Sequence, residues 1–358
     1  MKMRAVLILV PLLACGSSGH SGPPTVDSVA LPSGAALEPY PGATPLPRPE
    51  GMALSNGNVF IALSNLDSTF AVSGPSLLAE YVPSSGSTTL IDLGGADGKQ
   101  CKSAGFVRES NGLLYAVCGG DFNDGSGTAL VEVNPEAHAV TRRVAIPTSP
   151  AGVAAGPSRF WVGDAFGGNV YAIDKTSFTV VAGPIVIPCP STGTFTTTND
   201  VLVSGGDLYA LCSNNTGGVL SRLDAITGAF KMQADAGPTS VAIADIGDGR
   251  LAIASGADNS LRIVTVTASA LNVQVFATVF VGATATLQDI RARGQFLYTV
   301  ASGSNTVQKI DLNASGGPKV VAEANTGTGA NPWNIVPLDD NDAVVSNLGT
   351  NNLVKVAW

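Results

Sequence analysis

Short runs of alternating apolar and polar residues fill most of the chain, from about residue 48 to its end. Glycine, asparagine and aspartate gather between the runs, and Asn56-Gly57, Asn111-Gly112 and Asp248-Gly249 are typical of two-residue hairpin turns. A period of two residues indicates an extended strand, whereas a helix needs a period near 3.6. The pattern therefore predicts an all-β domain built from many short strands.

The runs also repeat as a larger unit of three recognisable strands. The second strands of these units lie at residues 58–64, 113–118, 159–163, 207–212, 250–255, 296–300 and 343–346. The first strands contain apolar residues that we treat as equivalent: Met52, Phe106, Val153, Val201, Val241, Ile290 and Ile335. Their spacing of about 40 to 54 residues matches one four-stranded propeller blade. The seven repeats predict a seven-bladed β-propeller over residues 46–358.

The last repeat ends after its third strand, at Trp358. A ring with an incomplete final blade would expose an unpaired strand edge, which promotes aggregation. Residues 26–31 alternate in the same way, so we expect this N-terminal strand to close the last blade. A β-solenoid is the competing architecture, but its repeats are usually shorter than these.

Two of the repeats carry a motif that is known from other proteins. Residues 297–311 (LYTVASGSNTVQKID) resemble the repeat of the YVTN family of bacterial β-propellers, and residues 160–174 (FWVGDAFGGNVYAID) are similar. Residues 49–53 (PEGMA), with the strand that follows them, resemble NHL-type repeats. The resemblance covers residues 48–358 and implies the propeller fold. It implies no particular activity, because this architecture hosts many unrelated functions.

The first residues have the features of an export signal. Two basic residues precede an apolar stretch at residues 5–13, which is too short to cross a membrane as a helix. The stretch ends in the sequence LLAC at residues 12–15, which resembles the lipobox of bacterial lipoproteins. That resemblance implies that residues 1–14 are a signal peptide and that Cys15 is lipid-modified. An ordinary signal peptide that is cut near a cysteine is the alternative.

A lipid on Cys15 would anchor the protein to the membrane of a bacterial cell envelope, because each buried methylene contributes about 0.8 kcal/mol. The next residue is Gly16 rather than aspartate, and resemblance to enteric lipoproteins then implies the outer membrane, on its periplasmic or surface side. Residues 15–45 are rich in Gly, Ser and Pro and have little sustained apolar pattern. We expect them to form a flexible tether, part of which supplies the closing strand.

Composition limits the partners of the protein. The net charge is −8 and only 13% of the residues are charged. Binding to nucleic acid or to anionic lipid requires clustered cations. We therefore expect no nucleic-acid partner, membrane contact only through the lipid anchor, and a monomer.

Four cysteines remain after Cys15, and they fall at matching places in two repeats. Cys101 and Cys189 precede a first strand, whereas Cys118 and Cys212 end a second strand. This recurrence predicts the disulfides Cys101–Cys118 and Cys189–Cys212, which an exported location permits. Other pairings are possible, and a thiolate metal site is the competing idea. That idea lacks a Cys-x-x-Cys pair and a neighbouring histidine.

The sequence contains no recognisable catalytic motif. His20 lies in the tether and His138 in a predicted turn, and they are the two histidines of the chain. A Ser-His-Asp arrangement in the domain would therefore depend on His138. There is no nucleophile elbow, no His-Glu-x-x-His, no phosphate-binding loop and no haem-attachment motif. We predict no catalytic residue and do not favour an enzyme.

In a propeller, the residues just before each first strand converge on the mouth of the central channel. Most of these residues are polar here, and the candidates for binding a ligand or metal are Glu50, Asn199, Asp200, Gln288, Asp289, Trp333 and Asn334. Oxygen ligands of this kind suit Ca²⁺, which is the one cofactor we consider. The arrangement is similar in type to the channel metal site of gluconolactonase-like propellers. The alternative is that these residues line a water-filled channel.

Two functions follow as hypotheses. The first is a non-enzymatic envelope lipoprotein whose propeller binds a protein, a glycan or a small ligand. The second is a calcium-dependent lactonase or hydrolase at the channel mouth, with its base among Glu50, Asp200 and Asp289. We favour the first, because the predicted fold is rigid, the lipobox implies a membrane location and the sequence shows no catalytic motif.

Overall fold

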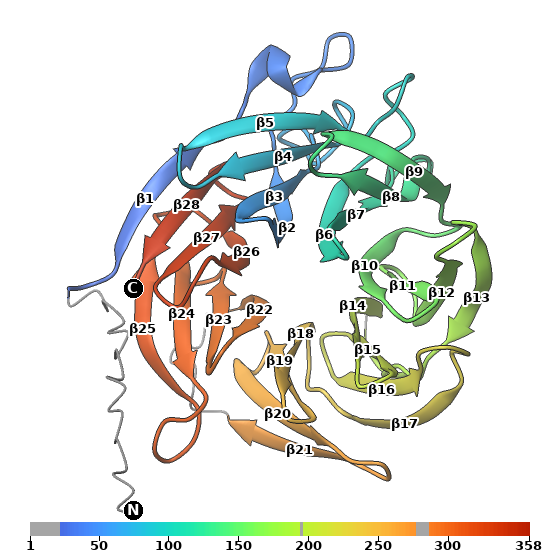
Figure 1. Cartoon of the computed structure of the whole chain (residues 1–358), viewed down its shortest axis with the longest axis vertical. Coiled ribbons are helices and arrows are strands. Elements are labelled where there is room, and N and C mark those ends of the chain that lie inside the picture. The colour runs from blue at the N-terminus through green and yellow to red at the C-terminus, as the bar shows by residue number, and fades with distance from the viewer. Residues whose placement is uncertain (1–21, 194–195, 277–285) are drawn as a thin grey trace, which may run out of the picture.

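The computed structural model describes residues 22–193, 196–276 and 286–358. Their strands form seven antiparallel sheets of four strands each, arranged as blades around a central channel (Figure 1). The predicted all-β, seven-bladed β-propeller is therefore confirmed. The predicted signal peptide and Cys15 lie outside the described residues, so the lipid anchor stays a prediction.

Blades 1 to 4 follow one another along the chain, and each runs from an inner strand at the channel to an outer strand at the rim. Blade 1 consists of β2 (Pro49–Ser55), β3 (Asn58–Leu63), β4 (Leu77–Val82) and β5 (Ser87–Asp92). Blade 2 consists of β6 (Ala104–Ser110), β7 (Leu113–Gly119), β8 (Thr128–Asn134) and β9 (Ala139–Ala145). Blade 3 consists of β10 (Pro150–Ala155), β11 (Arg159–Asp164), β12 (Asn169–Asp174) and β13 (Val180–Val186). Blade 4 consists of β14 (Thr197–Ser204), β15 (Asp207–Ser213), β16 (Gly218–Asp224) and β17 (Phe230–Asp235).

The remaining blades complete the ring. Blade 5 consists of β18 (Ser240–Gly247), β19 (Arg250–Ser255), β20 (Ser260–Val266) and β21 (Leu271–Phe276). Blade 6 consists of β22 (Leu287–Arg293), β23 (Phe296–Ala301), β24 (Thr306–Asp311) and β25 (Lys319–Asn325). Blade 7 consists of β26 (Pro332–Pro337), β27 (Asp342–Asn347), β28 (Asn352–Ala357) and, as its outer strand, β1 (Thr25–Ala30).

The N-terminal strand closes the last blade, as predicted. β1 pairs antiparallel with β28, from Thr25 opposite Ala357 to Ala30 opposite Asn352. In Figure 1 the blue β1 lies along the outer side of the red β28. The backbone groups on the outer edge of β28 are thereby paired, so that this strand does not present the open edge that an incomplete blade would leave.

Each inner strand begins with an irregular pairing, because the register skips near its first residues. An extra residue of this kind forms a β-bulge. In blade 2, Val107 rather than Phe106 is therefore equivalent to Met52 of blade 1. In blade 5, Ile243 rather than Val241 takes this place. The predicted equivalences of Phe106 and Val241 are wrong, because alternation alone does not reveal a bulge.

The hydrophobic core lies mainly between neighbouring blades. Phe60 of blade 1 belongs to one buried cluster with Leu114 and Val131 of blade 2. Tyr209 of blade 4 likewise shares a cluster with Ile253 of blade 5. Burying apolar surface contributes roughly 25 cal/mol per Å². Each blade is therefore stabilised chiefly by its two neighbours.

Part of the segment that we expected to be a tether packs on the propeller. The short 3-10 helix η1 (Gly34–Leu37) places Leu37 in a buried cluster with Leu63 and Leu77 of blade 1. The side-chain amide of Asn65 donates to the backbone oxygen of Leu37 at 3.0 Å. The described part of this segment therefore covers one end of blade 1.

The two ends of the propeller differ. We call the end at which the inner strands begin the loop face, because the long connections 31–48, 64–76, 93–103 and 120–127 all lie there. The opposite end, the turn face, carries tight hairpins between the first two strands of each blade. At 111–112 the φ angles are 55° and 76°, which is the left-handed conformation that an Asn-Gly hairpin turn requires. The two faces therefore differ in the length of their connections, and the long connections lie on the loop face.

Both predicted disulfides are present. Cys101 is bonded to Cys118 and Cys189 to Cys212, with Cα–Cα distances of 5.3 and 5.5 Å. Each ties a loop-face connection to the end of the second strand in its blade. Closing loops of 17 and 23 residues stabilises the fold by about 3 kcal/mol each in the chain-entropy model.

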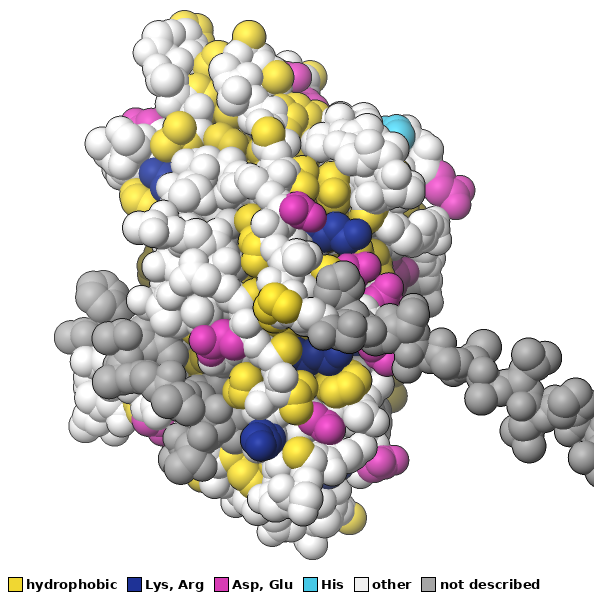
Figure 2. Space-filling model, turned by 90° about the vertical axis from the view of Figure 1, so that its left-hand side faces the viewer, with side chains coloured by type: hydrophobic (Ala, Val, Ile, Leu, Met, Phe, Trp, Pro, Cys, Tyr) yellow, Lys and Arg dark blue, Asp and Glu magenta, His cyan; other side chains and the backbone are white. Residues whose placement is uncertain are grey.

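Charged side chains are sparse on the side of the propeller shown in Figure 2. Lys and Arg side chains lie apart from one another there, and most have an acidic side chain nearby. They form no continuous cationic surface of the kind that binds phosphate backbones or anionic bilayers. Within residues 22–193, 196–276 and 286–358, no helix has the length and apolar composition needed to cross a membrane.

Candidate functional site

Six of the seven predicted channel-mouth residues line one cavity of about 200 Å³. They begin the inner strands of three blades, at the loop-face end of the channel, and are Asn199, Asp200, Gln288, Asp289, Trp333 and Asn334. Glu50 is not among the lining residues, although the adjacent Gly51 is. The sequence therefore predicted six of the thirteen residues that line this cavity.

Three of these side chains join neighbouring blades. They occupy equivalent places in β14, β22 and β26, directly after the bulge, and each accepts a backbone N–H of the next inner strand. The bonds run from Ile243 to Asp200 Oδ2 at 3.2 Å, from Ile335 to Asp289 Oδ2 at 3.2 Å, and from Met52 to Asn334 Oδ1 at 3.0 Å. Neighbouring blades are therefore linked by Asp200, Asp289 and Asn334. Each of these side chains accepts a hydrogen bond from a backbone N–H at the edge of the next inner strand.

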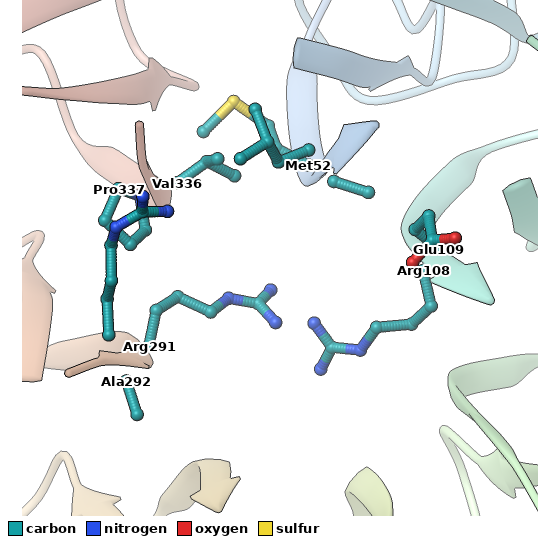
Figure 3. A pocket seen from close by; sticks show the side chains of 10 residues that line it. Met52, Arg108, Glu109, Arg291, Ala292, Val336 and Pro337 are labelled. Carbon is teal, nitrogen blue, oxygen red and sulfur yellow. The ribbon is translucent and has the colours of Figure 1, made fainter. Parts of the chain in front are cut away.

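Two arginines that were not predicted from the sequence pair with the channel aspartates. Nη2 of Arg108, in blade 2, lies 3.1 and 3.2 Å from the two carboxylate oxygens of Asp200 in blade 4. Nε of Arg291 lies 2.9 Å from Asp289 Oδ2. Blade 3 presents Gly152 between the first pair, where an added Cβ would lie 3.2 Å from the carboxylate. Figure 3 shows the guanidinium groups of Arg108 and Arg291 pointing into the channel towards each other.

Burial shifts the protonation of the channel carboxyls. It raises the pKa of Asp289 to about 7, against the opposing effects of the Arg108 charge and the Ile335 N–H. Burial also raises the pKa of Asp200, and Arg108 again opposes the shift. Away from the cavity lining, burial raises the pKa of Glu50 to about 7. Near neutral pH, Asp289 therefore populates both protonation states, and its negative charge is partial.

In the described part of the chain, the channel aspartates are not arranged as calcium ligands. Ca²⁺ takes six to eight oxygen ligands at about 2.3–2.6 Å. The oxygens of Asp200 and Asp289 are instead bonded to arginine and to backbone N–H groups. Among the described residues, no three His, Cys, Asp or Glu side chains are grouped so that they could hold a metal ion.

A second candidate site lies on the loop face, between blades 2 and 3. The rings of Phe122 and Phe166 are 61% and 63% exposed, and they meet edge to face with centroids 5.9 Å apart. Beside them is a cavity of about 460 Å³, which we call the aromatic cleft. Three loop-face connections line it with Gly119, Asp121, Phe122, Gly125, Thr128, Ile146, Pro147, Thr148, Ser149 and Phe166.

The loop that carries Phe122 is held in place by the buried side chain of Lys102. Nζ of the buried Lys102 lies 3.3 Å from Asp121 Oδ2 and donates to Ser126 Oγ at 2.7 Å. Gly127 allows this approach, because its φ is +78° and an added Cβ would lie 2.7 Å from the Lys102 side chain. Cys101, next to Lys102, is fixed by its disulfide. The loop is therefore ordered before any partner arrives.

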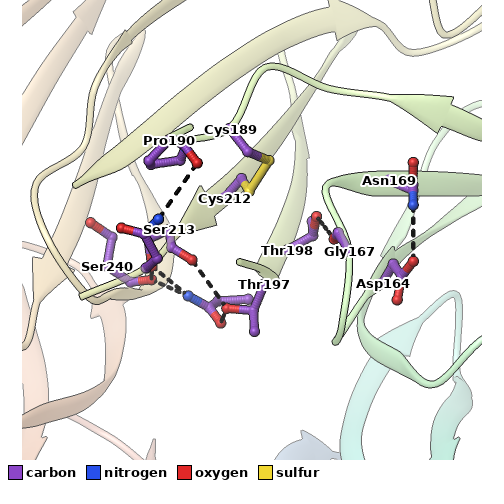
Figure 4. Close-up of a disulfide and its surroundings, with 12 residues drawn as sticks. Asp164, Gly167, Asn169, Cys189, Pro190, Thr197, Thr198, Cys212, Ser213 and Ser240 are labelled. Carbon is purple, nitrogen blue, oxygen red and sulfur yellow. Dashed lines mark hydrogen bonds between the residues drawn. A yellow bond between two sulfur atoms is a disulfide. The ribbon is translucent and has the colours of Figure 1, made fainter. Parts of the chain in front are cut away.

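Asp164 fixes the loop that carries Phe166. Its Oδ1 accepts the backbone N–H of Phe166 at 3.0 Å and the hydroxyl of Thr148 at 2.7 Å. Its Oδ2 accepts from the amide of Asn169 at 3.0 Å, a bond that Figure 4 shows near the Cys189–Cys212 disulfide. Hydrogen bonds to the buried side chains of Lys102 and Asp164 thus order both walls of the aromatic cleft. No sequence signal marks this site, because Phe122 and Phe166 meet only once blades 2 and 3 are side by side.

His138 lies in the turn that was predicted for it, away from the channel. Its Nε2 is 2.7 Å from Glu80 Oε2 of blade 1. The histidine therefore joins two blades at the turn face.

Comparison with known proteins supports the fold and leaves the function open. No protein family and no curated protein matches the sequence. A chain of Kuenenia stuttgartiensis hydrazine synthase is similar over 87% of this chain and 96% of its own, with a TM-score of 0.67 and 13% identity. BamB from Moraxella catarrhalis covers 93% of this chain and 98% of its own, with a TM-score of 0.53 and 12% identity.

A eukaryotic propeller is similar to the same extent. The Cps50 (Swd1) β-propeller domain of Myceliophteria thermophila covers 89% of this chain and 98% of its own, with a TM-score of 0.66 and 12% identity. At such low identity these similarities establish the propeller fold alone.

Proposed function

We propose that the protein is an exported binding module, held at the bacterial cell envelope by a lipid on Cys15. The module binds an envelope protein in the aromatic cleft. The observation that carries this proposal is the exposed pair Phe122 and Phe166 beside a 460 Å³ cavity. Exposed aromatic side chains next to a preformed pocket are typical of protein-binding surfaces.

The energetics favour occupation of the cleft by an apolar group. Fully burying one phenylalanine side chain contributes roughly 1.5–3 kcal/mol. Phe122 and Phe166 are the two most exposed aromatic side chains in the described part of the chain. Because hydrogen bonds and a disulfide already order both loops, a partner that inserts an apolar side chain has little ordering entropy to overcome.

Two observations support the location. The disulfides Cys101–Cys118 and Cys189–Cys212 are typical of an oxidising compartment outside the cytoplasm. The sequence at residues 12–15 resembles a lipobox. A Cys15→Ser variant should lose metabolically incorporated fatty acid and move from the membrane fraction to the soluble fraction of the envelope. Retention of the fatty acid in that variant would contradict the anchor.

A protein partner is also consistent with one structure that shares the fold. One similar propeller, with a TM-score of 0.63 and 13% identity, is part of a mitotic checkpoint complex. No contact in the described residues favours a glycan in particular. The calcium-dependent hydrolase has no observation in its favour either, since arginine and backbone N–H groups occupy the channel carboxylates.

Site-specific photo-crosslinking tests the proposed surface. A photoreactive amino acid at position 122 should give a discrete protein adduct in intact envelopes. The same amino acid at position 230 is the matched control, because Phe230 is 50% exposed on the rim strand β17. An adduct at 122 that is absent at 230 supports the cleft, whereas equal labelling at both positions would contradict it.

A further inference from the structure

The central channel contains an unassigned cationic site where Arg108 and Arg291 face each other (Figure 3). The 200 Å³ cavity at the loop-face end reaches both arginines, and so does a second cavity of about 280 Å³ towards the turn face. The two guanidinium groups therefore lie where the two cavities meet.

The two arginines are exceptions among equivalent positions. The residues that share their place in the other inner strands are apolar: Ala53, Ala154, Leu202, Ala244 and Val336. Arginine is therefore not a requirement of the propeller repeat. Its occurrence in blades 2 and 6 alone places two cations on facing walls of the channel.

Both guanidinium groups keep donors for a ligand. A guanidinium has five N–H donors in a planar fork. Among the described residues, Arg108 is bonded to Asp200 through Nη2, and Arg291 to Asp289 through Nε. Nη1 of Arg108 and both terminal nitrogens of Arg291 are not used by these bonds. The two side chains are 23% and 21% exposed, and the surface they expose lines the channel.

The larger cavity is lined by more cations than anions, because Asp200 and Asp289, which pair with the two arginines, line only the other cavity. The charged residues that line the larger cavity are Arg108, Arg291, Arg293 and Glu109. Glu109 accepts the backbone N–H of Gly112 at 2.7 Å, which directs its carboxylate to the hairpin turn. Asp200 and Asp289 offset part of the repulsion between the two guanidinium groups, and an anion between them would remove the rest. The cavity therefore favours an anionic ligand.

The walls of the same cavity are apolar. They are formed by Met52, Ala53, Leu54, Ala292, Val336 and Pro337. A hydrocarbon chain would contact the parts of these walls that reach the cavity, whereas a bare inorganic ion would not. The volume of 280 Å³ corresponds to about nine water molecules at about 30 Å³ each. This is room for a short aliphatic chain.

We propose that the channel binds a small aliphatic carboxylate. The carboxylate lies between Arg108 and Arg291, which present planar forks that match its two oxygens. The hydrocarbon chain extends towards the turn face, along Met52 and Val336. The ligand is thus an organic acid of about four to eight carbons, and its site is separate from the aromatic cleft.

Calorimetric titration of the purified full chain with four probes tests this site. Hexanoate should bind at least tenfold more tightly than hexanol, which has the same chain without the charge. It should also bind at least tenfold more tightly than phosphate or sulfate, which have the charge without the chain. Equal affinity for hexanol, or tighter binding of phosphate, would overturn the proposal.

Two variants and one control locate the binding. Arg291→Met should weaken hexanoate binding at least tenfold, and Arg250→Met, which changes an arginine outside the channel, should leave it unchanged. Val336→Phe keeps both guanidinium groups and fills the apolar part of the cavity, so it should cause a similar loss. If Arg291→Met does not fold, Val336→Phe tests the channel site. Unchanged affinity in folded Val336→Phe would overturn the proposal.

Discussion

Asn334 accepts the backbone N–H of Met52 at 3.0 Å, and this bond joins the last blade of the propeller to the first. The two residues are 282 positions apart in the sequence. Both are buried, at 5% and 1% exposure. Asp200 and Asp289 make the equivalent bond at two other blade junctions. The residues that the sequence suggested as channel ligands therefore hold the ring together.

Replacing Asn334 by alanine should destabilise the protein. The N–H of Met52 would remain buried without its acceptor, which costs roughly 1–3 kcal/mol. Chemical denaturation should show the free energy of unfolding lowered by that amount. Asn313→Ala, at an exposed loop position, is the control and should change it by less than about 0.5 kcal/mol. Equal effects of the two substitutions would show that the bond to Met52 is not stabilising.

Removing either disulfide by paired alanine substitution should lower the free energy of unfolding by about 3 kcal/mol. The two pairs should differ in their effect on partner binding. Cys101 adjoins Lys102, which holds the Phe122 loop, so Cys101→Ala with Cys118→Ala should weaken the partner adduct at position 122. Cys189→Ala with Cys212→Ala should leave that adduct intact. The reverse pattern would contradict the role given to the Phe122 loop.

Stability should depend on pH through Asp289. Its pKa is raised to about 7 in the folded protein, so between about pH 4 and pH 7 the folded state binds more protons at this site than the unfolded state. This contribution to stability is present below pH 4 and is lost as the pH rises through 7. Denaturation curves at pH 5 and pH 7.5 should show the loss for the natural protein.

Asp289→Asn is the control for this pH dependence. Asparagine can still accept the N–H of Ile335, but it does not titrate. Relative to the natural protein, the variant should therefore gain stability as the pH rises from 5 to 7.5. A difference between the two proteins that stays constant over this range would show that Asp289 titrates at its ordinary pKa.

Deleting residues 25–30 should cause self-association. The outer edge of β28 would lose its partner β1 and present unpaired backbone groups along the whole strand. Light scattering should reveal particles that grow with protein concentration. Deleting six residues of the predicted tether, 16–21, serves as the matched control and should leave the protein monomeric. Self-association of both variants to the same extent would contradict the role of β1.

The fold was predictable because its signals are local and repeated. Alternation marks the strands, Asn-Gly and Asp-Gly mark the hairpins, and the spacing of the repeats marks the blades. The disulfides followed from the same logic, since Cys101 and Cys189 occupy matching places. The alternation of residues 26–31 even identified the closing strand.

The chemistry of the channel was only partly predictable. The expectation that the residues before each inner strand converge was enough to predict that Asn199, Asp200 and Asp289 lie at the same cavity. It did not show that Arg108 reaches Asp200 across blade 3, because that contact depends on the curvature of the ring. The available signal was arginine at positions 108 and 291, where the equivalent positions of the other blades are apolar. The aromatic cleft had none, since its two rings come from different blades.

The affinity of the partner captured at position 122 tests the central claim most directly. The variant that combines Phe122→Ala with Phe166→Ala should bind this partner at least tenfold more weakly than the natural protein, about 1.4 kcal/mol, because both exposed rings are lost. Phe230→Ala, on the rim, should bind as the natural protein does. Affinities within twofold of one another for the double variant and the natural protein would contradict the account.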